Sequence, residues 1–182
     1  MNNFTRSSAM MIMLMSLVGT ATVGTASSSD PTKASGPSTL SKSDIGFFES
    51  AAQIGMTEVQ AAAIASSRAL GANTKAYAST MTSEHTANNE ALKSLAMRKG
   101  VSLPTQLNKD HQNLLDKLQN VDSKEFDALY AKDMTTGHDD AINLFENASK
   151  DSKDADVREF AKSTLPTLHH HLEMAKHLNE KG

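Results

Sequence analysis

Four ionisable side chains in this sequence stand on apolar faces of predicted helices. They are Glu58, His85, His138 and His171, one in each of four long helical segments. Burying a carboxylate or an imidazole is costly unless the group is hydrogen-bonded, paired with a charge or bound to a metal. Imidazole and carboxylate groups are common ligands in zinc, copper, iron and manganese sites. These residues are therefore candidate ligands for one transition-metal ion inside a helical bundle.

A methionine accompanies each of the three histidines. Met81 precedes His85 by four residues, Met134 has the same spacing from its histidine, and Met174 follows its histidine by three. Residues three or four apart share one side of a helix, so each thioether is predicted one turn from an imidazole. Methionine with histidine favours copper, although methionine is also a common core residue. We therefore expect copper, iron or zinc, and the sequence leaves the choice among them open.

The same four side chains also allow an interpretation without a metal. In a buried hydrogen-bond network they would fix the register of the helices, as buried polar groups do in some bundles. Tyr130 stands on one of these faces and could join the network. The protein would then be a non-catalytic structural or envelope-stress bundle.

The consecutive histidines His169, His170 and His171 do not form one unit on a helix. An α-helix turns about 100° per residue. By this geometry His171 lies within about 40° of the centre of the apolar face, and its two neighbours lie more than 100° away. We therefore expect His171 in the core and the other two in solvent.

The apolar periodicity predicts helices almost everywhere from Asp44 onward, and no convincing strand. A short leader helix capped by Asp44 would end or bend at Gly55. Pro166 should kink or divide the last helix. Long helices are predicted over residues 58–70, 74–99, 124–150 and 154–179, and a shorter connecting helix over 105–120. Together they predict an all-α, antiparallel four-helix bundle with a short leader helix and one extra connecting helix.

The first 43 residues are not expected to belong to this bundle. Residues 1–26 have a positive start, a short apolar run and small residues at a possible cleavage site, which is typical of a secretory signal peptide. An uncleaved anchor is the alternative. Residues 27–43 are rich in Ser, Thr, Pro and Gly and predict a flexible linker. We therefore expect residues 44–182 to form the domain, exported to the periplasm or secreted.

Composition excludes several other classes of function. The chain has no cysteine, so disulfides, thiolate metal sites, cysteine catalysis and a lipoprotein anchor are excluded. A net charge of −3 gives no basic face for nucleic acid. After the signal peptide no second hydrophobic segment predicts a membrane span. No Gly-x-Ser-x-Gly motif is present, so we assign no catalytic residue, and the oligomeric state is left open.

Four blocks of the sequence resemble one bacterial family of exported proteins. The blocks are DIGFFESAAQIGMTEVQAAAIASSRA, YASTMTSEHTANNEAL, EFDALYAKDMTTGHDDAINLFENA and LPTLHHHLEMAKHL. The family is the domain of unknown function number four thousand one hundred and forty-two, which is placed with the ferritin-like folds. The resemblance covers residues 44–179 and includes all four candidate ligands. It implies a ferritin-like four-helix bundle and no particular activity.

The chain departs from the ligand pattern of di-iron ferritin-like proteins. Such a site needs Glu-x-x-His on two helices and further glutamates on the others. The residues three positions before the inward histidines are Thr82, Thr135 and Leu168. We therefore expect neither ferroxidase activity nor iron storage.

Overall fold

The computed structural model describes residues 40–178, which form five α-helices and no strand. The helices are α1 (Lys42–Arg68), α2 (Ala72–Lys99), α3 (Lys109–Asn120), α4 (Phe126–Asp151) and α5 (Ala155–Lys176). The predicted signal peptide lies outside the described residues, as does the predicted linker up to residue 39. Among residues 40–178, no helix combines the length and the apolar character needed to cross a membrane.

The first helix differs from its prediction, because α1 is continuous and has no separate leader helix. It begins with a capping box in which Ser41 is the N-cap and Asp44 accepts from the Ser41 backbone N–H, at 2.9 Å. Gly55 does not break the helix. A Cβ there would lie 1.8 Å from Asn89 Oδ1 of α2, so the glycine permits close packing of two helices.

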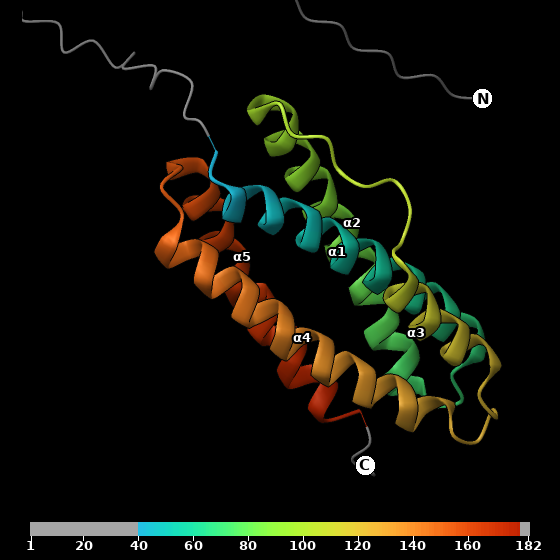
Figure 1. Cartoon of the computed structure of the whole chain (residues 1–182). Helices are drawn as coiled ribbons and strands as arrows, with labels where there is room; N and C mark the ends of the chain where they lie inside the picture. Colours follow the sequence, from blue (N-terminus) through green and yellow to red (C-terminus); the bar gives the residue numbers. More distant parts are fainter. Residues whose placement is uncertain (1–39, 179–182) are drawn as a thin grey trace, which may run out of the picture. The chain divides into compact units, whose positions relative to one another are not determined.

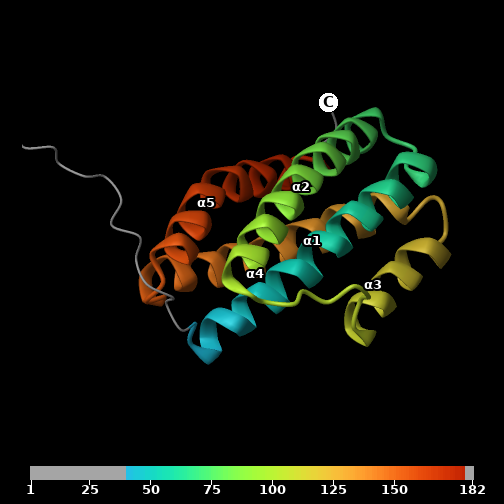
Figure 2. The same cartoon turned by 90° about the horizontal axis from the view of Figure 1, so that it is seen from above.

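The other helix ends follow local sequence signals. Gly100 ends α2 in the left-handed conformation, with φ of 69°. Asp154 caps α5 by accepting hydrogen bonds from the backbone N–H groups of Asp156 and Val157. Pro166 does not divide α5, which remains one helix and curves along its length (Figure 2). The connecting helix α3 starts at Lys109, later than predicted, because Asn108 is its N-cap.

Helices α1, α2, α4 and α5 form the bundle, and each is antiparallel to its neighbours (Figures 1 and 2). Short connections join α1 to α2 and α4 to α5. Because α2 and α4 run in the same direction, the segment between them must return along the bundle, and it contains α3. A single long crossover of this kind is the connectivity of ferritin-like bundles. The all-α four-helix bundle predicted from the sequence is confirmed.

The core has two apolar clusters along the bundle. One includes Phe47, Phe48 and Phe145, and the other includes Tyr77 and Tyr130. Each cluster contains residues from all four bundle helices. In the sequences of α2, α4 and α5, the inward histidines stand between residues of one cluster and residues of the other. The structure therefore places a polar layer between two apolar layers.

Candidate metal centre

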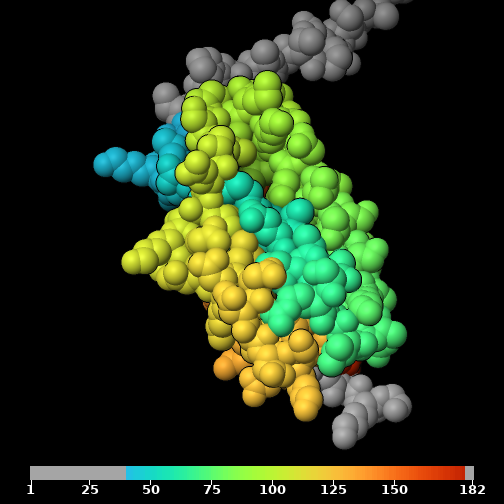
Figure 3. Space-filling model, turned by 90° about the vertical axis from the view of Figure 1, so that its right-hand side faces the viewer, coloured from blue at the N-terminus to red at the C-terminus, as the bar shows by residue number. Residues whose placement is uncertain are grey.

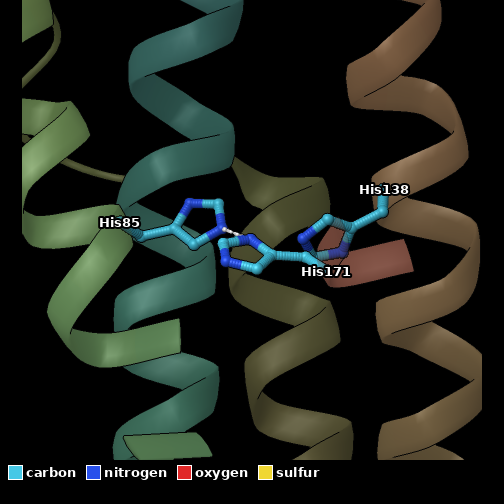
Figure 4. A group of neighbouring side chains, drawn as sticks. All are labelled: His85, His138 and His171. Carbon is cyan, nitrogen blue, oxygen red and sulfur yellow. Dashed lines mark hydrogen bonds between the residues drawn. The ribbon is translucent and has the colours of Figure 1, made fainter. Parts of the chain in front are cut away.

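Three histidines from three helices meet in this polar layer. His85 of α2, His138 of α4 and His171 of α5 are buried, with exposed fractions of 4%, 1% and 0%. Their ring centroids lie 5.1 to 5.6 Å apart, and Figure 4 shows the rings close together in the core. One nitrogen of each ring lies within 4.8 Å of the nitrogens offered by the other two. The three side chains could hold a metal ion.

Hydrogen bonds define which nitrogen of His171 carries the proton. Its Nε2 lies 2.9 Å from Glu84 Oε2, and a carboxylate can only accept, so Nε2 carries the hydrogen. In the neutral ring Nδ1 then carries a lone pair, and it accepts a hydrogen bond from His85 Nε2 at 3.2 Å (Figure 4). A carboxylate that accepts a hydrogen bond from a histidine ligand and fixes its orientation is common in metal sites.

His138 is oriented by its own helix. Its Nδ1 lies 2.8 Å from the backbone carbonyl of Met134, one turn earlier in α4, and donates to it. The other nitrogen, Nε2, is buried without a hydrogen-bond partner among the described residues. An unpartnered lone pair inside a protein is unfavourable. A metal ion would use this lone pair, and a backbone carbonyl on the opposite nitrogen is typical of histidine ligands.

The electrostatics of the cluster keep the imidazoles neutral. Burial, together with the neighbouring His138 and His171, lowers the pKa of His85 to about 3. Burial also lowers the pKa of His138 to about 4. The pKa of His171 is lowered by burial, against the opposing effect of Glu84. Only a neutral imidazole binds a metal, so these rings are in the binding form at neutral pH.

The distances suit a small ion bound by nitrogen. Zn–N bonds of 2.0–2.1 Å in tetrahedral geometry place two ligand nitrogens about 3.3 Å apart. His85 Nε2 and His171 Nδ1 are 3.2 Å apart. The remaining separations are at most 4.8 Å, so closing the site needs only small side-chain shifts. His85 would also have to move its proton from Nε2 to Nδ1.

A groove between α2 and α5 leads to this site from the surface. Its volume is about 360 Å³, and its lining includes Glu84, His85 and His171. The side chain of Glu84 is 44% exposed while it holds His171. An ion at the three histidines could therefore exchange, and water could complete its coordination.

Comparison with known proteins places the chain in a family. Residues 29–178 match the family described as "Domain of unknown function (DUF4142)". The protein belongs to the DUF4142 family. The fold of this DUF4142 chain is also similar to the "Crystal structure of DUF305 fragment from Deinococcus radiodurans", with a TM-score of 0.69 and 12% identity. The match covers 79% of this chain and 100% of that chain, and at this identity it shows the fold alone. No curated protein matches the sequence.

Of the four candidate ligands in this DUF4142 protein, Glu58 lies outside the group of converging side chains. The group contains the three histidines only. Glu58 is buried in α1, where its Oε1 lies over Gly137 of α4. Met81 and Met134 are buried and Met174 is half-buried. His169 and His170 are exposed, as the helical phase predicted.

Glu84 is the residue of the DUF4142 site that sequence reasoning missed. It stands at the edge of the apolar face of α2, because it is adjacent to His85 and points about 100° away from it. That direction is toward α5, where His171 meets it. An acidic residue beside an inward histidine is a weak signal, because the partner on another helix appears only in the folded structure.

Proposed function

We propose that the protein binds one copper or zinc ion through His85, His138 and His171. The unpartnered Nε2 of His138 is the observation that carries this proposal, because it faces the core beside two further imidazoles. Imidazole suits zinc, copper and iron. Copper and zinc fit better than iron, since no carboxylate among the described residues belongs to the ligand group.

We propose further that this binding occurs outside the cytoplasm. The signal-peptide pattern of residues 1–26 supports export. Three protein ligands with an accessible fourth position allow the ion to be exchanged or to bind a small ligand. The groove beside Glu84 provides such access. The function that fits best is binding of an exchangeable metal ion in the cell envelope or its surroundings.

The alternative is a structural network of buried histidines. The hydrogen bond between His85 and His171 favours it, because two of the three rings are already paired. In that case the polar layer would fix helix register without a metal. The two functions differ in one respect: only the first predicts stoichiometric, histidine-dependent binding.

The experiment is calorimetric titration of tag-free, chelator-treated protein with Cu²⁺, Zn²⁺ and Fe²⁺. We expect one copper or zinc ion per chain, and loss of binding in His138→Gln. The matched control is the double variant His169→Gln with His170→Gln, which removes two exposed imidazoles of the same helix as His171. Binding that persists in His138→Gln, or that is lost only in the control, would contradict the proposal.

A further inference from the structure

A second cleft lies away from the histidines, between α1, α4 and the segment that contains α3. Its volume is about 960 Å³. Figure 3 shows α3 (yellow) against α1 (teal) and beside α4 (orange), which are the elements that enclose it. The groove at the histidines lies between α2 and α5, and the linings of the two share no residue. Clefts of this size accommodate small organic molecules.

Glu58 lies in the lining of this cleft. Its side chain is 4% exposed, and Oε2 is buried without a hydrogen-bond partner among residues 40–178. A buried carboxyl group without partners destabilises the fold. Because the cleft reaches Glu58, a ligand with a hydrogen-bond donor could supply the missing partner.

Gly137 keeps the space beside Glu58 open. It stands in the middle of α4, where glycine costs about 1 kcal/mol relative to alanine. A Cβ at this position would lie 3.1 Å from Glu58 Oε1, and Gly137 lines the cleft. The glycine therefore leaves space next to the carboxyl group, and a side chain at this position would narrow that space.

The charge of the lining favours a cation. Glu49, Asp133 and Asp140 line the cleft together with Glu58, and Lys132 is the one lysine or arginine in the described lining. Asp133 Oδ2 is also buried and has no hydrogen-bond partner among the described residues. The three carboxyl groups besides Glu58, against one ammonium group, attract a positively charged ligand.

An organic cation suits this cleft better than a metal ion does. Apolar side chains of Ile54, Leu103 and Leu114 also line the cleft, and they would contact an apolar body. Within residues 40–178 the only group spaced to hold a metal ion is the three histidines. We propose that this cleft binds a small organic amine, whose ammonium group pairs with Glu58 while its apolar part contacts these side chains.

The test is an NMR titration of tag-free protein with benzylammonium, a primary ammonium on an apolar ring. Benzyl alcohol, which has a similar shape and no charge, is the ligand control. We expect shifts at residues of α1, α3 and α4, and an affinity for benzylammonium at least about tenfold higher than for the alcohol. Equal affinities, or no shifts with about 10 mM benzylammonium, would overturn the proposal.

Two variants test the residues. Glu58→Gln keeps the size of the side chain and should weaken benzylammonium binding at least about tenfold. Gly137→Ala should weaken it by narrowing the cleft, in a helix that alanine favours. Glu159→Gln, which removes an exposed carboxylate of α5, is the control and should bind normally. Unchanged binding in both Glu58→Gln and Gly137→Ala would refute the proposal, as would a Glu58→Gln protein that loses zinc and keeps the amine.

Discussion

Replacing Glu58 by glutamine should stabilise the protein at neutral pH. Burial raises the pKa of Glu58 from its ordinary 4.5 to about 8. In the ligand-free folded protein the carboxyl group is therefore protonated across a range in which it is ionised in the unfolded chain, whereas an ammonium ligand beside it would favour the ionised form. Folding in this pH range must therefore take up a proton, which lowers the free energy of unfolding. Glutamine does not ionise and avoids this cost.

The sign and size follow from this pKa difference. Below pH 4.5 the group is neutral in both states and imposes no penalty. As pH rises toward 8, unfolding releases a proton, so the free energy of unfolding of the wild type falls by about 1.4 kcal/mol per pH unit. Between pH 5 and pH 7 the stability of Glu58→Gln relative to wild type should therefore rise by roughly 2.5 kcal/mol. Above pH 8 the difference should become constant.

The assay is urea denaturation of both proteins at pH 5, 6 and 7 after chelator treatment. Only the difference between the two proteins is interpreted, because the histidines titrate equally in both. Glu159→Gln serves as the control, since an exposed carboxylate should give a difference within about ±0.5 kcal/mol at every pH. A difference for Glu58→Gln that does not grow with pH would refute the buried, unpartnered state of this carboxyl group.

Three further predictions concern the histidine site and the start of the chain. Glu84→Ala should weaken metal binding by about 10–100-fold in a competition titration, and Glu84→Gln should weaken it less, because an amide oxygen still accepts from His171. The pKa values of the inner histidines are lowered, so the unfolded chain takes up protons first as pH falls. In urea denaturation, the free energy of unfolding of the metal-free protein should thus fall by about 1.4 kcal/mol per pH unit for each histidine as pH drops below 6.5. The variant in which all three histidines are glutamine should show a weaker dependence on pH. N-terminal sequencing of exported protein should find a start near Ser27, and a chain retaining residues 10–18 would contradict the signal peptide.

Helical periodicity was sufficient to predict the fold and which histidines point into the core. A period of 3.6 residues separates His171 from its exposed neighbours without knowledge of any other helix. Periodicity gives no depth along the bundle axis, however. His85, His138 and His171 share one level, while Glu58 lies outside their group, and this depends on helix register that only packing determines.

Contacts between helices account for the remaining differences. Gly55 resembles a helix end in the sequence, yet it lies against Asn89 and lets α1 continue. Glu84 is on the edge of a helix face and becomes part of the site through α5. The cleft beside Glu58 requires three separate elements and has no signature in any single segment. Such features follow from tertiary packing, which overrides local signals.

X-ray absorption of the protein loaded with one equivalent of Zn²⁺ tests the metal site most directly. We predict three imidazole nitrogens at about 2.0–2.1 Å from the zinc, completed by an oxygen ligand. The same spectrum should be absent in the variant that replaces His85, His138 and His171 by glutamine. Zinc surrounded by oxygen ligands alone, or a spectrum unchanged in that variant, would contradict a metal centre formed by these histidines.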